Sequence, residues 1–388
     1  MRNKLIRITT VPLSLEKLLG GQLSYMKEYF DVTAVSSNGS YLKTVGEKEN
    51  IDMFCIEMTR QITIAKDIKA VYKLYRFLKK EKPFIVHSHT PKAGIVGMLA
   101  AWLAQVPIRL HTVAGLPLVE AGGFKRKILN LVENLTYACA TNVYPNSFGL
   151  QNIIIQNRFC SPEKLKVIAN GSSNGIDTSF FNPSLFLDSE KQSLRNQISL
   201  KNDDFVFIFV GRLVSDKGIN ELIEAFDNIS QHDKTVKLLL VGPMEPDLDP
   251  LKEKTINIIN TNKNIIAVGY QSDIRPYLAI SDALVFPSYR EGFPNVVMQA
   301  GAMELPSIVT DINGCNEIII EGENGVIIPA KNAIALKEKM ELFITNKTLL
   351  SKLKSNARQM ITSRYEQKVV WEALLAEYKS LETQYKNV

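Results

Sequence analysis

Short apolar runs rich in β-branched residues alternate with helical patterns along the whole chain, and this alternation limits the fold more than any other feature. The runs are nearly continuous in hydrophobicity, which is typical of strands covered by helices on both faces and therefore of a parallel sheet. In the first half they lie at residues 5–10, 32–36, 53–58, 84–89, 108–113, 142–145 and 166–169.

The same pattern starts afresh in the second half, with runs at residues 205–210, 237–241, 265–268, 283–286 and 307–310. A chain of 388 residues exceeds one ordinary core. We therefore predict an α/β protein of two Rossmann-like, doubly wound domains that face each other across a cleft. The expected domains are residues 1–185 and 186–365, with a last amphipathic helix at about 366–388 that packs back on the first domain.

Several classes of protein are disfavoured by composition. No run of about 18 apolar residues suggests a membrane span, and the polar N-terminus does not resemble a signal peptide. The four cysteines are scattered without a CxxC, and His87 and His89 lack an accompanying carboxylate cluster. We expect a cytoplasmic protein with no structural metal and no cofactor.

Charge is distributed unevenly between the two halves. Residues 1–187 carry 23 Lys and Arg against 13 Asp and Glu, whereas residues 188–388 carry 23 against 27. The basic half is expected to meet something anionic, such as nucleic acid, a membrane surface or a phosphorylated substrate. The basic residues lack the interleaved aromatic and glycine pattern of an RNA-binding sheet, which argues against nucleic acid.

Two basic patches in the first half predict docking to an anionic membrane surface. Five cations at spacings of 3 and 4 fall along one helical face. The alternative is a solvated outer helix. The first patch comprises Lys66, Lys69, Lys73, Arg76 and Lys80, and the second comprises Lys125, Arg126 and Lys127.

The segment GRLVSDKG, residues 211–218, directly follows the run at 205–210 and directly precedes a helical pattern. Arg212 and Lys217 place two cations at the end of a strand, beside a helix N-terminus. That combination suits a diphosphate, since the guanidinium binds oxygens bidentately and the helix end adds N–H donors. The alternative is a turn with two solvated cations.

A second loop, residues 287–295, follows the run at 283–286. Glu291 is expected to accept hydrogen bonds from hydroxyls, and Gly292 lets the backbone approach a ligand closely. Pro294 suits the first turn of a helix, and Gln299 lies about two turns further along the same face. The alternative is a surface carboxylate before a capped helix.

A pair of glycines, Gly20-Gly21, follows the first strand and an intervening loop. Such glycines let backbone N–H groups reach a phosphate, although a plain turn is the alternative. The G-x-G-x-x-G fingerprint is missing after this strand, which argues against a dinucleotide site.

These elements, in this order, resemble glycosyltransferase family 4, whose members have the GT-B fold. The resemblance covers nearly the whole chain and is most specific at residues 281–329, with GRLVSDKG as its second anchor. It is nearest to bacterial enzymes that build lipid-linked oligosaccharides and polysaccharides, such as the α-1,3-N-acetylgalactosaminyltransferase of an N-glycan pathway.

The resemblance implies roles for individual residues. It makes Arg212 and Lys217 the cations that bind the donor diphosphate, and Glu291 the carboxylate that contacts donor-sugar hydroxyls; these three are the expected catalytic residues. The first domain is then the acceptor-binding domain and the second the donor-binding domain. The remaining residues expected to bind the donor are Gly20, Gly21, Gly211, Val268, Gly269, Tyr270, Gly292, Phe293, Pro294, Asn295 and Gln299.

The chain departs from the family pattern at two positions. Gln299 stands where the second acid of the E-x7-E motif is usual, so a neutral amide replaces a charge-assisted acceptor. Ala114 stands where the family often has a histidine. His111 lies three residues earlier and on the opposite face of a strand, and we interpret it as a packing residue.

The resemblance implies a retaining, metal-independent transfer from a nucleotide sugar, with UDP-N-acetylhexosamine as first choice, to a lipid-linked saccharide at the inner face of the membrane. The departing phosphate would take the acceptor proton. GDP-mannose, GDP-fucose and UDP-glucose remain alternative donors. A nucleotide-sugar 2-epimerase, which needs no acceptor, and a non-enzymatic dinucleotide- or nucleic-acid-binding module are the rival functions.

Overall fold

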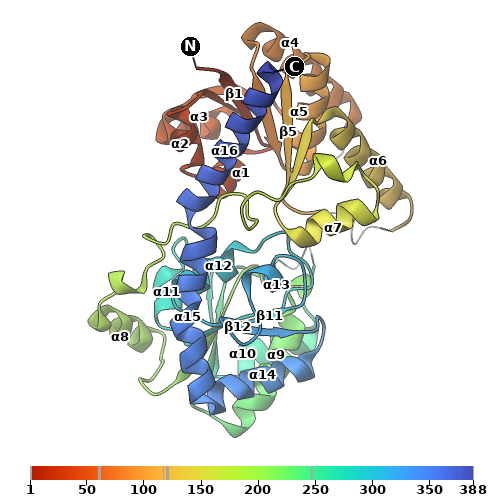
Figure 1. The fold of residues 1–388 in the computed structure, drawn as a ribbon. Coiled ribbons are helices and arrows are strands. Elements are labelled where there is room, and N and C mark those ends of the chain that lie inside the picture. Colours follow the sequence, from red (N-terminus) through yellow and green to blue (C-terminus); the bar gives the residue numbers. More distant parts are fainter. Residues whose placement is uncertain are drawn as a thin grey trace. The chain divides into compact units, whose positions relative to one another are not determined.

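The computed structural model describes residues 2–59, 63–116, 118, 122–245, 247 and 249–387. The chain divides into two compact units. Unit 1 comprises Met1–Gly175 and Gln367–Val388, and unit 2 comprises Ile176–Glu366 (Figure 1). Each unit contains one parallel sheet flanked by helices, so the predicted α/β class with two doubly wound units is confirmed.

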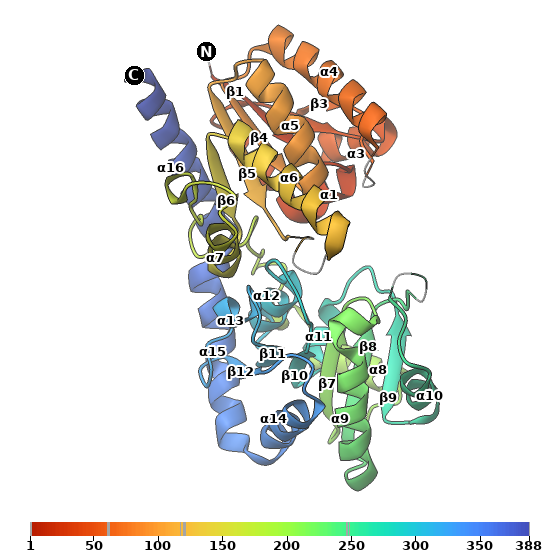
Figure 2. The ribbon, with the colours of Figure 1, turned by 90° about the vertical axis from the view of Figure 1, so that its right-hand side faces the viewer.

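In the described part of unit 1, the sheet has six strands in the order β3-β2-β1-β4-β5-β6. Helices α4, α5, α6 and α7 cover one face, and α1, α2, α3 and α16 cover the other. Figure 2 shows α4, α5 and α6 side by side on their face. The strands are β1 (Lys4–Ile8), β2 (Asp31–Ser36), β3 (Asp52–Cys55), β4 (Ile85–His89), β5 (Ile108–Val113) and β6 (Asn142–Pro145). The helices are α1 (Pro12–Leu19), α2 (Gln22–Lys27), α3 (Gly39–Glu49), α4 (Ile64–Glu81), α5 (Pro91–Leu103), α6 (Gly123–Cys139), α7 (Phe148–Gln156) and α16 (Gln367–Lys386).

Unit 2 repeats this architecture, with strand order β12-β11-β10-β7-β8-β9 among its described residues. The inner strands are largely buried, as parallel strands between two helix layers require, whereas the outer strand β9 is more open, with Ala267 and Gly269 exposed. The strands are β7 (Phe205–Val210), β8 (Val236–Val241), β9 (Ile265–Gly269), β10 (Ala283–Phe286), β11 (Ser307–Thr310) and β12 (Gly325–Ile328). The helices are α8 (Asp188–Gln197), α9 (Ile219–His232), α10 (Glu253–Thr261), α11 (Arg275–Ala279), α12 (Asn295–Ala302), α13 (Cys315–Ile318), α14 (Ala333–Thr345) and α15 (Lys347–Tyr365).

The division between the units falls earlier than the sequence pattern placed it, at Gly175 instead of residue 185. Ile176 donates its N–H to Tyr365 O at 2.8 Å, and the Thr178 side chain bonds the carboxylate of Glu366. These contacts tie residues 176–178 to the end of α15 and so to unit 2. The final helix α16 packs on unit 1, where Tyr378 is fully buried.

Two expectations about strands were wrong. Residues 166–169 form no strand; the neighbouring Leu165 makes only an isolated bridge to Val143. Conversely, β12, a four-residue strand at the edge of the sheet, was not predicted. None of the helices in the described part of the chain combines the length and the apolar character that crossing a bilayer requires.

Gly218 joins the loop after β7 to α9, and no other residue fits there. Its φ is +70°, and a Cβ atom would lie 2.1 Å from Pro287 O, in the loop after β10. Gly269, at the end of β9, has a similar φ of +68°, but a Cβ there would meet nothing within 4 Å among the described residues. The two glycines therefore share a backbone conformation and differ in the space around them.

We expect Gly218→Ala to lower the free energy of unfolding by about 3 kcal/mol, because left-handed strain adds to a backbone clash. Gly269→Ala is the matched control and is expected to cost about 1 kcal/mol, for the strain alone. Midpoints of denaturant unfolding measure both. Equal midpoints for the two variants would show that the loops after β7 and β10 are not held in close contact.

Candidate active site

The predicted donor residues of unit 2 lie at one edge of its sheet, where β7 and β10 end. These strands are neighbours and run parallel, with Ala283 opposite Phe207 and Leu284 opposite Ile208. Because the carboxyl ends of parallel strands share an edge, the loops that follow them meet there. This edge is the usual place for ligands in doubly wound sheets.

Lys217 and Glu291 form an ion pair across this edge, between Lys217 Nζ and Glu291 Oε1. Ser288 Oγ donates to the same carboxylate oxygen at 3.0 Å. The side chains of Lys217 and Glu291 are 15% and 17% exposed, so the pair is largely shielded yet reachable by a ligand. The structure thus brings together two of the three predicted catalytic residues, which are 74 positions apart in the chain.

Backbone and side-chain contacts hold the two loops in register. Tyr289 N donates to Asp216 O at 2.9 Å, and Arg290 Nη2 lies 3.1 Å from Asp216 Oδ2. The Tyr289 hydroxyl donates to Glu221 Oε2 at 2.5 Å, which ties the second loop to α9. Together with the close packing at Gly218, these contacts fix where Lys217 and Glu291 point.

A third loop, after β11, supports the backbone around Glu291. Asn313 Nδ2 donates to Glu291 O and, at 3.2 Å, to Gly292 O. Thr310 Oγ1 donates to Ser288 O. Sequence reasoning missed Asn313, although a polar loop directly after a buried strand was the signal that could have found it. Cys315, at the start of α13, is buried nearby, and burial raises the pKa of its thiol well above the usual range, so it stays neutral.

Arg212 binds a partner that sequence reasoning also missed. Its Nη1 lies 2.9 Å from Glu245 Oε2, in the loop after β8. Both side chains are partly exposed, at 42% and 31%. Arg212 is on the same edge of the sheet as Lys217, since β8 is the other neighbour of β7, but its ion pair is with Glu245 instead of Glu291.

The N-terminus of α12 follows the Glu291 loop directly. Pro294 is its N-cap, and Asn295 is its exposed first residue, so the positive end of the helix dipole lies directly after this loop. The Phe293 ring is 8% exposed and contacts Tyr365, with ring centroids 5.3 Å apart. Phe293 is therefore anchored in the core, and its backbone remains at the edge. Gln299 is half-buried in the middle of α12.

The remaining predicted donor residues of unit 2 flank this edge. Gly211 immediately follows β7 and its carbonyl lies against Gly242. Val268 and Gly269 end β9, the outer strand beyond β8. Tyr270 follows with a side chain that is 71% exposed, so its ring is open to stacking.

In unit 1, the structure gives Gly20 and Gly21 a packing role that the sequence did not predict. Gly21 N donates to Glu49 Oε1 at 2.7 Å, so this amide is not free for a phosphate. Gly20 O accepts from Asn174 Nδ2 at 3.0 Å, and a Cβ on Gly21 would lie 2.8 Å from the Trp371 ring. Gly21 thus admits α16 close to the loop after α1, whereas a Cβ on Gly20 would meet Glu16 O of α1.

His111 lies within β5, and Ala114 directly follows the strand. His111 is buried, its Nδ1 is 2.9 Å from Ser88 Oγ, and burial lowers its pKa to about 4. His111 is therefore a neutral packing residue, as predicted. Within the described residues, no group of three or more His, Cys, Asp and Glu side chains has the arrangement of a metal site.

Of the two predicted basic patches, the first is fully on the surface. Lys66, Lys69, Lys73, Arg76 and Lys80 are all exposed on α4. In the second, at the start of α6, Lys125 and Lys127 are exposed. Arg126 departs from the prediction, because its guanidinium bonds Leu118 O and, at 3.0 Å each, the side chains of Asn130 and Asn157. The guanidinium thus bonds to other parts of unit 1 instead of facing a partner.

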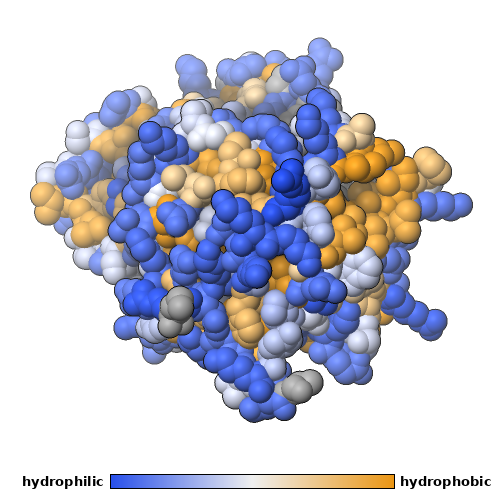
Figure 3. Space-filling view, turned by 90° about the horizontal axis from the view of Figure 1, so that it is seen from above, coloured by the Kyte–Doolittle hydropathy of each residue, from blue (hydrophilic) through white to orange (hydrophobic). Residues whose placement is uncertain are grey.

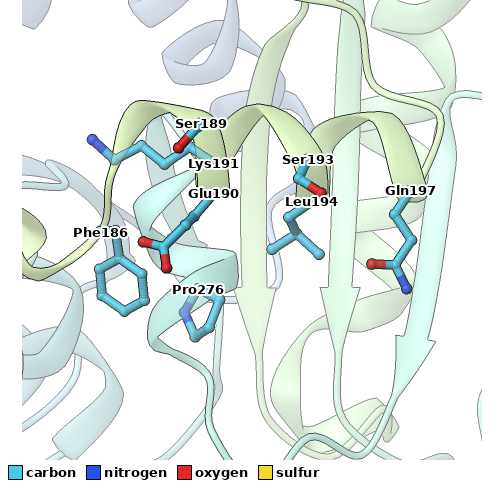
Figure 4. A pocket seen from close by; sticks show the side chains of 8 residues that line it. All are labelled: Phe186, Ser189, Glu190, Lys191, Ser193, Leu194, Gln197 and Pro276. Atoms are coloured by element: carbon cyan, nitrogen blue, oxygen red, sulfur yellow. The ribbon is translucent and has the colours of Figure 1, made fainter.

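A groove of about 450 Å³ lies elsewhere on unit 2, beside α8 (Figure 4). Its apolar lining comes from Phe186, Leu194 and Pro276. Arg195 of α8 binds the carbonyls of Asp204 and Ile280, which precede β7 and β10. The groove is therefore at the amino ends of these strands, away from Lys217 and Glu291.

Two family models match the chain. The model described as glycosyl transferases group 1 matches residues 190–360, and the glycosyl transferase 4-like domain matches residues 30–171. Together they cover most of both units, including the GRLVSDKG segment and the loop that carries Glu291.

Relatives and solved structures agree with these models. The chain is 36% identical over 382 residues to the capsular polysaccharide biosynthesis glycosyltransferase CapM of Staphylococcus aureus, covering 98% of each chain. It is 33% identical over 298 residues to the Escherichia coli UDP-Gal:alpha-D-GlcNAc-diphosphoundecaprenol alpha-1,3-galactosyltransferase, covering 75% of this chain and 74% of the relative.

Among solved structures, the fold matches Anabaena Alr3699/HepE in complex with UDP, with a TM-score of 0.81 and 21% identity over 98% of this chain and 100% of that one. The predicted GT-B fold is thereby confirmed. With both domain models and a relative matched along nearly its whole length, the chain belongs to the group 1 glycosyl transferases, with a glycosyl transferase 4-like domain in its first half, and is a glycosyltransferase enzyme.

Proposed function

We propose that the protein transfers a sugar, with retention of configuration and without a metal ion, from a UDP-linked N-acetylhexosamine to a lipid-linked saccharide in surface polysaccharide synthesis. The Lys217–Glu291 ion pair at the shared edge of β7 and β10 is the observation that carries this proposal. It sets a cation and a carboxylate side by side, as a sugar diphosphate needs.

The two charges suit two different parts of the donor. Lys217 and Arg212 stabilise the negative charge that grows on the departing diphosphate, and the N–H groups at the start of α12 add to that effect. Glu291 accepts hydrogen bonds from donor-sugar hydroxyls, which orients the ring. Tyr270, exposed after β9, offers a ring for the nucleobase.

In the proposed reaction, the bond between the anomeric carbon and the diphosphate oxygen breaks, and its electron pair stays with the diphosphate. An acceptor hydroxyl forms the new bond on the same face of the sugar. Its proton passes to the departing phosphate oxygen, so no protein base is required. Ala114, in place of the histidine common in this family, is consistent with that route.

The lipid-linked acceptor is supported by the relatives. The name of the E. coli relative specifies a diphosphoundecaprenol acceptor, and that of the S. aureus relative specifies capsular polysaccharide biosynthesis. The same E. coli name specifies UDP-Gal as donor, and the HepE structure binds UDP, which favours UDP over GDP in the donor proposed here.

We expect Lys217→Ala to lower turnover by at least about 100-fold, the scale of losing one preorganised electrostatic contact. Turnover is measured as sugar transfer to an undecaprenyl-diphosphate-linked saccharide. The donors to be compared are UDP-N-acetylglucosamine, UDP-N-acetylgalactosamine, UDP-galactose, UDP-glucose, GDP-mannose and GDP-fucose. The highest rate is expected with a UDP-N-acetylhexosamine, in the presence of a chelator.

Lys254→Ala is the matched control, since Lys254 is an exposed lysine on α10 of the same unit, and its turnover should equal that of the unmodified protein. Near-normal transfer by Lys217→Ala would remove this residue from the site. Conversion of the donor sugar without any acceptor would instead identify a 2-epimerase.

The first basic patch and its surroundings support docking to the inner face of the membrane. On α4, Ile64, Ile68 and Tyr72 are 72%, 65% and 59% exposed and recur every four residues, beside the exposed lysines. On α6, Phe124 is 78% and Leu131 is 68% exposed. Figure 3 shows hydrophobic side chains, in orange, next to hydrophilic ones, in blue, on the face that it draws. Apolar side chains ringed by cations suit the surface of an anionic bilayer, where each cation contributes about 1 kcal/mol.

We expect the protein to sediment with vesicles containing phosphatidylglycerol at low salt and to be released at high salt, because exposed charges are screened. The double variant Lys69→Glu/Lys73→Glu should lose most of this binding. The fraction of protein in the vesicle pellet measures the effect.

The control is Lys254→Glu/Lys263→Glu, which makes the same change of charge at two exposed lysines of unit 2 and should leave the pelleted fraction unchanged. Equal binding to neutral phosphatidylcholine vesicles, or an equal loss in both double variants, would contradict a role for the α4 patch.

A further inference from the structure

Arg7 is a fully buried arginine without a carboxylate partner. It is the fourth residue of β1 and is 0% exposed. Its Nη2 donates to Gln22 Oε1 at 2.7 Å and lies 2.8 Å from His89 Nε2. Nε and Nη1 have no partner among the described residues, and no Asp or Glu there forms an ion pair with this guanidinium. A buried cation is costly unless a negative charge offsets it.

The contact with Arg7 fixes the tautomer of His89. A guanidinium only donates hydrogen bonds, so His89 Nε2 must accept this one. Burial and the charge of Arg7 lower the pKa of His89 well below its usual value, so the ring is neutral and its proton is on Nδ1. His89 Nδ1 is buried and lacks a partner among the described residues. His89 Nδ1 is therefore a hydrogen-bond donor with a fixed direction, and the charge of Arg7 on the other side of the ring polarises it.

The side chain of His89 lines a cavity of about 20 Å³ beneath α16, together with those of Asn146, Ser173 and Leu374. One water needs roughly 10–15 Å³, so the cavity takes about one oxygen atom of a larger group and not a sugar ring. Ser173 Oγ and Asn146 Oδ1 are also buried without partners among the described residues. Ser173 supplies a second donor, and the Asn146 amide, turned about its last bond, supplies a third.

This cavity lies where ligands of doubly wound sheets bind. His89 ends β4 and Asn146 follows β6, at the carboxyl edge of the sheet in unit 1. Gln22 joins the cluster to the loop beyond β6, since its Nε2 donates to Ser173 O at 3.0 Å. Ser173 is half-buried, so the cavity approaches the surface on that side.

We propose that this cavity is a binding site for one oxygen of a small oxyanion, which reaches it from the side of Ser173, accepts hydrogen bonds from His89 Nδ1 and Ser173 Oγ and offsets the charge of Arg7. A water would satisfy the hydrogen bonds but would leave the cation uncompensated. The ligand is phosphate, either as the free ion or as a phosphate group of the acceptor. Only the second source rests on the proposed function.

The test is the effect of inorganic phosphate on the thermal midpoint of the full-length protein, at constant ionic strength, in the Lys217→Ala background that weakens anion binding at the donor site. A ligand that binds the folded state raises this midpoint by mass action. Asn146→Asp places a fixed negative charge in the cavity and should weaken phosphate binding at least about tenfold, the scale of one charge-assisted hydrogen bond. Ser173→Ala removes one unpartnered donor and should weaken it less.

Asn134→Asp, an exposed amide on α6, is the matched control and should bind phosphate like its parent. The proposal is overturned if phosphate leaves the midpoint of the parent unchanged, or if it shifts the parent and Asn146→Asp equally. In either case the cavity holds no more than water. The thermal midpoint measures phosphate binding and not catalysis. This outcome is therefore independent of whether the protein transfers a sugar.

A transfer assay with proteins that keep Lys217 distinguishes the free phosphate ion from a phosphate group of the acceptor. If the site binds a phosphate of the acceptor, Asn146→Asp raises KM for an undecaprenyl-diphosphate-linked saccharide about tenfold, keeps kcat, and leaves KM for the phosphate-free saccharide unchanged. If it binds the free ion, both KM values stay unchanged while the phosphate-dependent midpoint shift is lost. Each result supports the site and names its ligand.

Discussion

The parallel pairing of β7 with β10 is the constraint on which the candidate active site depends. It brings the loops after these strands to one edge of the sheet, although they are more than seventy residues apart in sequence. Gly218 then allows the loops to touch at Pro287 O, and the bond from Tyr289 N to Asp216 O holds them in register. The ion pair of Lys217 with Glu291 is the result of this backbone arrangement, and the chemistry proposed for the enzyme follows from the pair.

Much of this arrangement could be predicted from local patterns. Buried strands of a parallel sheet are continuous apolar runs, so 205–210 and 283–286 marked β7 and β10, and the cations and carboxylate directly after them marked the site. The partners of these groups could not be predicted in the same way. Glu245 meets Arg212 only because β8 lies beside β7, and Asn313 supports Glu291 only because β11 lies beside β10. Strand order is a property of the whole sheet and is not contained in either loop.

Unit 1 shows the same limit more strongly. A strand period of two places Arg7, His87 and His89 on one face of the sheet, which the sequence does reveal. Their burial depends on α16, which begins at Gln367 and packs Leu374 and Tyr378 over that face. The same helix explains Gly21 of the Gly20-Gly21 pair, which looked like a phosphate loop, since Gly21 makes room for Trp371. A contact between Gly21 and Trp371, 350 positions apart in the chain, leaves no local signal.

The pairing of Arg212 with Glu245 has a consequence for the turnover of the enzyme. In the proposed reaction, an incoming diphosphate does not meet a bare guanidinium but displaces a carboxylate already bound to it. Loading the donor is therefore an exchange of counter-ions, whose net gain is smaller than that of neutralising a free cation. The displaced carboxylate remains nearby as an intramolecular competitor. In the proposed reaction, this competition lowers the affinity of the site for the donor and for the spent nucleotide alike, so the product leaves more readily than it would from an unpaired arginine.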